Sequence, residues 1–153
     1  MKSSRGNGAF PLTSRSVALV GGVLLCMMMQ SALPSETAAT LYKECRDKPS
    51  TAEQRDCYPA VVRQSEIELE AAEKKVRAGM VELEKISQGS HAMHPVRAFD
   101  QAERAFRAFR DAESNRALAS YGSGNGGGLA GFETIIEMNI ARANLLTGEA
   151  GTR

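Results

Sequence analysis

The chain has 153 residues, a formal net charge of +1, 5% aromatic residues and no tryptophan. This length allows one small domain beside a targeting segment, with a core built mainly from aliphatic and alanine side chains. The near-neutral charge excludes the basic footprint that is typical of nucleic-acid binding. After residue 40 no β-branched alternation is found and helical spacing dominates, so we predict an all-α fold.

The first 39 residues have the pattern of a secretory signal peptide. Basic residues at positions 2, 5 and 15 accompany an apolar run at 17–29, and a polar segment with small residues follows. The run is shorter than the about 20 residues that a membrane-spanning helix needs. We therefore predict a signal peptide over 1–39, cleaved after Ala32, Ala38 or Ala39. The product is expected to be periplasmic or secreted and to meet the membrane only through this segment during export.

Two other fates of this segment stay open. Cys26 raises the alternative of a lipoprotein, although Leu25 before it is not the small residue that lipidation requires, and the second alternative is a retained signal anchor. Removing residues 1–39 takes away three basic residues and one acidic residue, which leaves 16 and 17 and a net charge of −1. That charge is too small for a purely electrostatic grip on a cationic partner.

The rest of the chain contains two cysteines, Cys45 and Cys57. An even pair in an exported domain most simply forms a disulfide. Closing a loop this short stabilises a fold by up to about 3 kcal/mol on the chain-entropy argument. The alternative, a metal pair, lacks further cysteines, and both histidines lie far along the chain. We expect the disulfide.

The first helices are expected to be short. Residues 41–47 are predicted to form a helical turn that carries Cys45, and Ser50 and Glu53 fit a capping box that starts a second short helix to about residue 57. Pro59 is then expected in the first turn of a long helix, where its missing N–H costs nothing. That helix should run to about residue 87, where a loop over 87–94 begins.

The long helix carries a heptad-like stripe in two rows. Such a stripe favours antiparallel pairing at a shallow angle. Its outer face carries glutamates at i,i+4 spacing to lysine or arginine. The two rows are Val62, Leu69, Val76 and Leu83, and Ser65, Ala72, Gly79 and Ile86.

The central helix is predicted from Pro95 to about Ser120. Phe99, Ala102, Phe106 and Phe109 recur at spacings of three or four residues, which places them on one helix face. We expect the other helices to pack against this face. Charged residues at i,i+4 spacing are predicted to pair along the exposed side, among them Glu103 with Arg107.

A glycine-rich loop at 121–131 separates the central helix from the last one. The last helix is predicted from about 129 to 146, with Gly148 ending it and residues 148–153 forming a flexible tail. Its apolar side is expected to carry Phe132, Ile135, Ile136, Ile140 and Ala143. The fold is thus a small helical bundle, or a long helical hairpin with a third docked helix, over residues 40–147.

Chemistry is hard to assign to this sequence. The glycine loop lacks the Lys-Ser/Thr ending and the preceding strand of a phosphate-binding motif, so it is read as a connector. As a loop it could present contacts to a partner through Tyr121, Ser123 and Asn125. His91 and His94 have no cysteine or acidic neighbour to complete a metal site. No nucleophile–histidine arrangement can be assembled, so we predict no enzyme, no metal and no cofactor.

Arg110 and Asp111 stand at the end of the aromatic stripe. An inward-leaning Arg110 would meet a carboxylate from another helix, and Arg142 would do the same from the last helix. The alternative is that all three are surface charges. The sharper hypothesis is an ion-pair network that ties the helices together.

These residues lead to a resemblance. The run AERAFRAFRDAES at 102–114 is similar to the central motif of the LprI-like lysozyme-inhibitor family of secreted bacterial proteins. That motif has two aromatics three apart, here Phe106 and Phe109, and then Arg110, Asp111 and an alanine. The Cys45 and Cys57 segment and the C-terminal part with Arg142 resemble the same family over roughly residues 41–147.

The sequence also departs from the family pattern. A second cysteine pair is common there, and here Ser114 and about Thr134 replace its members. Phe106 stands where the family usually has tryptophan. Losing both cysteines together is consistent with losing one disulfide.

The resemblance implies export, an α-helical fold, a disulfide and lysozyme binding. The first hypothesis is therefore a periplasmic lysozyme inhibitor that acts by occlusion, with loop 121–131 as the contact and the disulfide shaping the opposite end. The second hypothesis is a periplasmic interaction or envelope-stress module whose partner is another envelope protein. The near-neutral charge of the mature chain motivates it.

Overall fold

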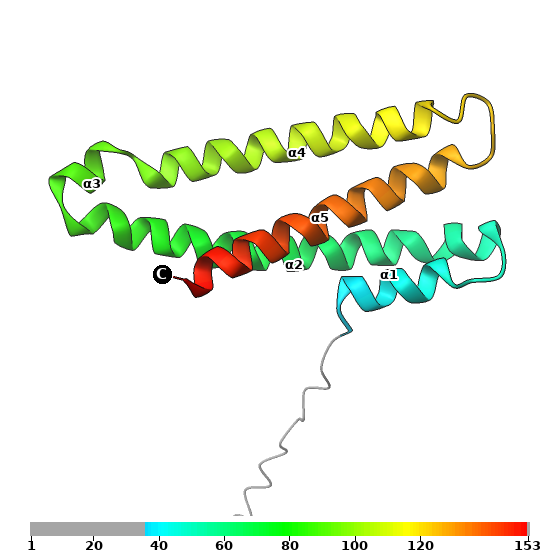
Figure 1. Ribbon diagram of the computed structural model, residues 1–153, viewed down its shortest axis with the longest axis horizontal. Coiled ribbons are helices and arrows are strands. Elements are labelled where there is room, and N and C mark those ends of the chain that lie inside the picture. The colour runs from blue at the N-terminus through cyan, green and yellow to red at the C-terminus, as the bar shows by residue number, and fades with distance from the viewer. Residues whose placement is uncertain (1–35, 153) are drawn as a thin grey trace, which may run out of the picture. The chain divides into compact units, whose positions relative to one another are not determined.

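The computed structural model describes residues 36–152, which form five helices and, within that range, no strand. They are α1 (Ala38–Arg46), α2 (Thr51–Ile86), α3 (Gln88–Ala92), α4 (Pro95–Ala119) and α5 (Gly127–Gly151). Figure 1 shows α2 and α4 as a long antiparallel hairpin, with α5 packed on both and α1 folded back on the start of α2. The predicted all-α fold is confirmed. We predict a signal segment over 1–39, and its residues 1–35 lie outside the described part of the chain.

The start of α2 is set by its cap. The Ser50 hydroxyl accepts a hydrogen bond from the Glu53 N–H, as the capping box predicted. From there α2 runs without a break, so the predicted boundary at Pro59 is wrong. Proline inside a helix removes one backbone hydrogen bond and costs about 3 kcal/mol. Here Tyr58 and Val61 are buried on either side of it, and their packing offsets that cost.

Two other helix boundaries differ from the sequence prediction. Residues 87–94 are not only a loop, because they contain α3, which the Ser87 hydroxyl caps by accepting from the Ser90 N–H. The last helix passes Gly148 and ends at Gly151. A glycine is compatible with a helix interior at a cost of about 1 kcal/mol, so Gly148 does not oblige α5 to stop.

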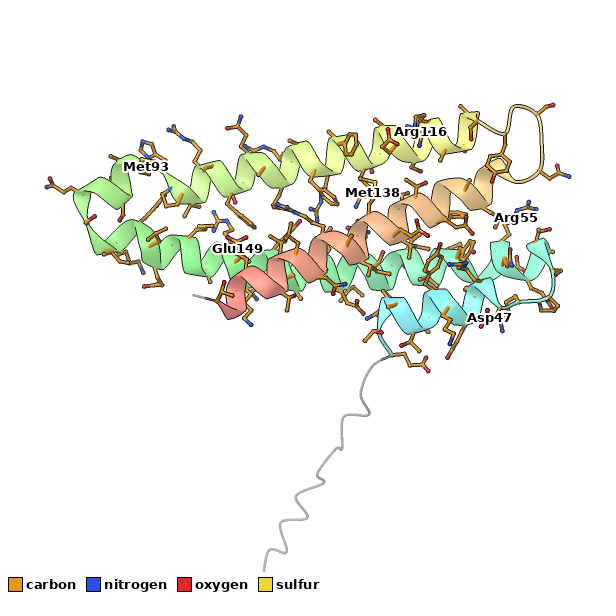
Figure 2. The ribbon with its side chains drawn as sticks, viewed as in Figure 1. Asp47, Arg55, Met93, Arg116, Met138 and Glu149 are labelled. Carbon is orange, nitrogen blue, oxygen red and sulfur yellow. A yellow bond between two sulfur atoms is a disulfide. The ribbon has the colours of Figure 1, made fainter. Side chains whose placement is uncertain are left out.

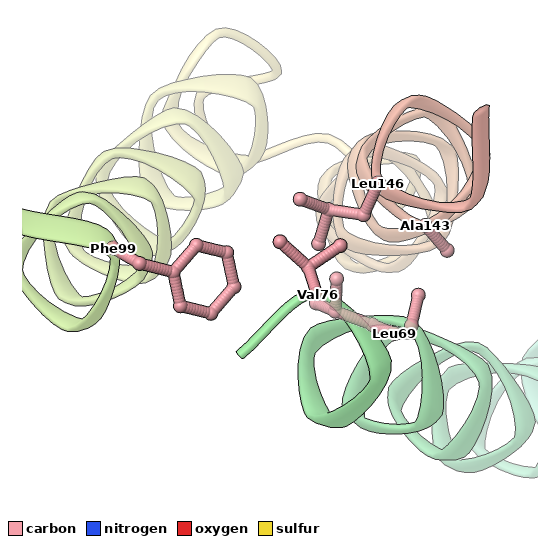
Figure 3. Close-up of a cluster of buried hydrophobic side chains, with 6 residues drawn as sticks. Leu69, Val76, Phe99, Ala143 and Leu146 are labelled. Carbon is pink, nitrogen blue, oxygen red and sulfur yellow. The ribbon is translucent and has the colours of Figure 1, made fainter. Parts of the chain in front are cut away.

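The core consists of two apolar clusters. One joins Leu69, Val76 and Ala72 of α2 to Phe99 of α4 and to the last turns of α5 (Figure 3). The other lies near the disulfide and joins the ends of α1, α2 and α5. Its buried members are Cys45, Tyr58, Val61, Leu129 and Ile136.

The face that α4 turns inward is not the one we predicted. Phe99 and Phe106 do lie toward the core, but Ala102 is exposed and the Phe109 side chain is 59% exposed. Glu103 and Arg110 are buried in their place. The aromatic spacing predicted that the aromatic side chains lie at the centre of the buried face of α4. Charged residues occupy that centre instead, because partners on α2 and α5 neutralise them.

Candidate functional site

The glycine loop between α4 and α5 is tightly built. Gly122 has a φ of +55°, which glycine adopts without strain, and the loop then folds back on the Tyr121 ring. A Cβ at Gly126 would lie 2.6 Å from Cε1 of Tyr121, and one at Gly127 would lie 2.7 Å from the Leu118 carbonyl oxygen. The backbone contact therefore requires glycine at position 127, whereas a side chain at position 126 would displace the Tyr121 ring. Tyr121, Ser123 and Asn125 are all exposed on this loop.

The start of α2 holds the far side of the loop. The Arg55 guanidinium donates a hydrogen bond to the Asn125 backbone carbonyl at 3.1 Å. This contact places the loop at the same end of the bundle as the α1–α2 turn, and Figure 2 shows Arg55 and Asp47 there and Met93 at the other end. We had expected the disulfide to shape the end opposite the loop, and that expectation is wrong. The chain reverses once between the two segments, at α3, so both reach one end.

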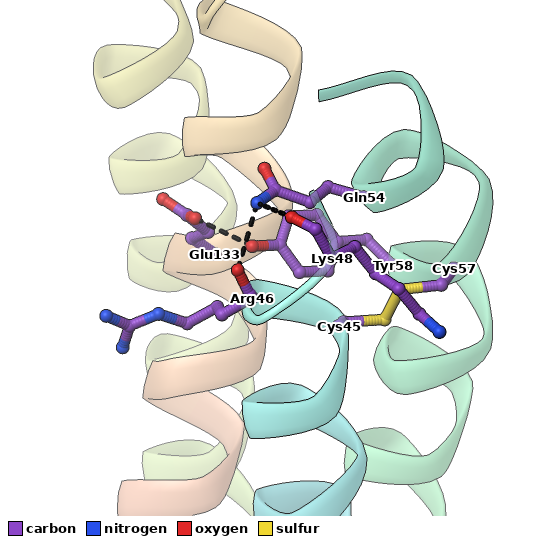
Figure 4. Close-up of a disulfide and its surroundings, with 7 residues drawn as sticks. All are labelled: Cys45, Arg46, Lys48, Gln54, Cys57, Tyr58 and Glu133. Atoms are coloured by element: carbon purple, nitrogen blue, oxygen red, sulfur yellow. Dashed lines mark hydrogen bonds between the residues drawn. A yellow bond between two sulfur atoms is a disulfide. The ribbon is translucent and has the colours of Figure 1, made fainter. Parts of the chain in front are cut away.

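The disulfide joins Cys45 of α1 to Cys57 of α2, with the Cα atoms 6.0 Å apart. The turn that it closes is also fixed by Gln54, whose side-chain amide donates to the carbonyls of Arg46 and Lys48 (Figure 4). Cys45 is buried in the second apolar cluster. The disulfide therefore cross-links α1 and α2 at the end of the bundle that carries the glycine loop 121–131, which we call the loop end.

Two tyrosines, one on α1 and one on α2, attach α5 to the cross-linked helices. The Tyr58 hydroxyl donates to a Glu133 carboxylate oxygen at 2.8 Å, and the Tyr42 hydroxyl donates to Glu137 at 2.7 Å. Burial, followed by the hydrogen bond to Glu133, holds the pKa of Tyr58 well above its usual value. Burial and the bond to Glu137 raise the pKa of Tyr42 in the same way. Both hydroxyls therefore stay protonated donors at physiological pH.

A polar layer separates the two apolar clusters. Asn139 of α5 is fully buried, donates to the Ser65 hydroxyl of α2 at 3.0 Å and accepts from the Arg110 guanidinium of α4 at 2.8 Å. Arg110 also pairs with Glu66 of α2 and with Asp111. One layer of side chains therefore connects all three long helices. Every buried side-chain polar atom in residues 36–152 has a partner.

Ion pairs extend from this layer toward the α3 end. Arg107 of α4 pairs with Glu73 of α2, and Arg142 of α5 pairs with Glu103 of α4. Burial raises the pKa of Glu73, with the neighbouring Glu103 adding to that effect and Arg107 opposing it. The i,i+4 pair that we predicted between Glu103 and Arg107 is wrong, because both side chains turn to other helices. These charged residues form ion pairs between helices and not along the exposed face of one helix.

The family model described as "Lysozyme inhibitor LprI" matches residues 45–146. The chain belongs to the LprI family. No curated protein and no solved structure matches the chain.

The LprI match spans the disulfide, the polar layer and the glycine loop. The motif residues lie in different surroundings. Arg110 and Asp111 join the polar layer, Arg142 stacks over the Phe106 ring with its guanidinium carbon 5.6 Å from the centroid, and Phe109 faces away from the core. Ser114 donates to the Gly131 carbonyl at 3.0 Å. A hydrogen bond thus joins α4 to α5 near the place where the resemblance puts a second disulfide.

Sequence reasoning missed several members of the polar layer in this LprI-family chain. Ser65 and Asn139 occupy positions on helix rows that are otherwise apolar, and this break in pattern was the available signal. Glu66 and Glu103 gave no signal, since a glutamate on a helix is usually solvated.

His91 lies in α3, and His94 is the residue just before α4. The rings of His91 and His94 lie 5.9 Å apart, but residues 36–152 contain no group of three histidine, cysteine or acidic side chains placed to hold a metal ion. Nor does any helix in that range have the length and apolar character to cross a bilayer.

Proposed function

We propose that this LprI-family protein is an exported inhibitor that binds a lysozyme-type muramidase and blocks it without chemistry. The observation that carries the proposal is the family match across residues 45–146. Ion pairs between helices make the bundle a rigid support for a contact surface, which suits a protein that acts by binding. The protein would act by covering the substrate cleft of its partner.

We propose the loop end as the contact surface. Tyr121 presents a half-exposed ring, and Ser123 and Asn125 present polar side chains beside it. Close approaches at Gly126 and the Arg55 hydrogen bond to the Asn125 carbonyl fix the loop before binding. A preorganised loop loses less conformational entropy on association, which favours tight binding through a small surface.

An inhibition titration tests this function. The protein, secreted from its full-length sequence and oxidised, is titrated against lysozymes of several classes during digestion of purified cell walls. Dose-dependent inhibition is expected. Ser123→Trp adds bulk at the loop and should weaken inhibition at least tenfold, whereas Met93→Trp, at an exposed position of the other end, should leave it unchanged.

Two outcomes contradict the proposal in different ways. If no lysozyme class is inhibited at large molar excess, the near-neutral charge of the mature chain favours the second function, in which another envelope protein is the partner. If inhibition occurs but Met93→Trp weakens it more than Ser123→Trp does, the contact lies at the α3 end.

A further inference from the structure

The C-terminal part of α2 carries an apolar surface that no other described helix covers. α5 ends at Gly151, and beside its last turn a groove of about 710 Å³ opens along α2. Gly79, Leu83 and Ile86 line this groove, and the Leu83 and Ile86 side chains are 37% and 73% exposed. The groove lies in the C-terminal part of α2. Figure 1 shows this part of α2 at the end of the bundle opposite the α1–α2 turn and the glycine loop.

The groove continues a stripe that packs elsewhere in the same helix. Ser65, Leu69, Ala72 and Val76 belong to the two heptad-like rows of α2 and are buried, mostly by α5. Gly79, Leu83 and Ile86 are the next members of these rows, where only the last turn of α5 lies beside the groove, through Glu149 and Ala150. A stripe at this spacing is shaped to pack against a helix. The spacing of the stripe therefore favours a helix as the partner that binds in the groove.

Charges along the groove indicate which helix fits. Glu149 of α5 is one charged residue in its lining, and Lys75 and Glu82 of α2 line it on either side of Gly79. They lie about 6 Å and about 4.5 Å from Gly79 along the helix axis, at a rise of about 1.5 Å per residue. In an antiparallel two-fold crossing at Gly79, the lysine of each copy therefore meets the glutamate of the other. This self-complementary pattern is what an isologous interface between two identical chains requires.

The glycine at the crossing point supports the same occupant. A Cβ at Gly79 would meet nothing within 4 Å, so packing within the chain does not require glycine there. Glycine in a helix interior is nevertheless unfavourable relative to alanine. Glycine at this position allows the backbone of a second helix to approach closely, and a side chain would prevent that approach.

We propose that two copies of this chain associate by pairing the Gly79–Ile86 parts of α2 antiparallel across a two-fold axis near Gly79. Leu83 and Ile86 of each copy fill the groove of the other, and two reciprocal Lys75–Glu82 ion pairs fix the register. Glu82 already pairs with Lys85 in its own chain at 2.8 Å, but both side chains are exposed and exchange at little cost. The loop end of each copy stays exposed in this dimer. Dimer formation therefore does not depend on the proposed binding of lysozyme.

Sedimentation velocity over a wide concentration range tests the dimer, with the oxidised protein secreted from its full-length sequence. Lys75→Glu and Glu82→Lys should each weaken the dimer by about 2- to 30-fold, the loss expected for two surface ion pairs. The double variant should recover the dissociation constant of the parent. Lys48→Glu, at the opposite end, is the matched control and should have no effect.

Gly79→Leu provides a second readout that does not depend on charge. Leucine is a better helix former than glycine, so the monomer should keep its helical content and melting temperature while the dimer is lost. The proposal is overturned if the parent is monomeric throughout. It is equally overturned if a dimer forms whose dissociation constant neither Gly79→Leu nor either charge reversal changes.

Discussion

Asn139 offers a direct test of how the polar layer holds the three long helices. Its side chain is fully buried and makes two hydrogen bonds, one with the Ser65 hydroxyl and one with the Arg110 guanidinium. A neutral hydrogen bond contributes about 1 kcal/mol and one to a charged group about 1.5–3 kcal/mol. Asn139→Ala should therefore lower the free energy of unfolding by about 2.5–4 kcal/mol, before any cavity cost is added.

Asn144→Ala is the matched control for this variant. Asn144 lies on the same helix and is exposed, so both substitutions gain the same helix propensity, which favours alanine by up to about 0.7 kcal/mol. The difference between the two variants isolates the buried contacts.

Urea unfolding followed by far-ultraviolet circular dichroism gives that difference, provided that the two variants share one slope. The reasoning is refuted if the free energies of unfolding of the two variants agree within about 0.5 kcal/mol, the usual scale of a surface substitution. Such a result would mean that Arg110 and Ser65 find other partners without loss.

Further measurements address other parts of the fold. Reducing the α1–α2 disulfide, which closes a sequence separation of 12, should lower stability by up to about 3 kcal/mol in urea unfolding, and an unchanged midpoint would contradict this. The raised pKa of Tyr58 means that the unfolded chain loses this proton first, so stability should fall above about pH 10, and Tyr58→Phe should make the fall shallower. Gly127→Ala, with its Cβ against a backbone carbonyl, should cost about 1–3 kcal/mol, while Gly128→Ala, which meets nothing within 4 Å, should be neutral in the same assay. If the predicted leader is removed, mass spectrometry should find an N-terminus upstream of Thr37, because this residue caps α1 and the next N–H is bonded to a carboxylate.

The sequence was informative where one local signal controlled one local structure. The capping box at Ser50 and the proline at position 95 each mark a helix start that the structure has. The heptad-like rows gave the buried face of α2 from Ser65 to Val76. In each case the chemistry that sets the structure lies within a few residues of it.

The failures have a common physical origin, since they depend on contacts between distant segments. Pro59 looked like a helix start because packing of its neighbours on α5 is invisible in the local pattern. Glu103 looked solvated because its partner, Arg142, is on another helix. An inward-leaning Arg110 was among the hypotheses, but its partner Glu66 on α2 could not be identified from the local pattern. The position of the glycine loop beside the disulfide likewise required the path of the whole chain.

The placement of the disulfide has a consequence for resistance to proteolysis. It links α1 to α2, so it lies wholly within the half of the described chain that precedes α3. The turn that contains α3 is therefore the sole covalent connection, among residues 36–152, between the α1–α2 pair and the α4–α5 pair. A protease that cuts at this turn produces two fragments, and the two apolar clusters and the layer around Asn139 must then hold them together without a cross-link.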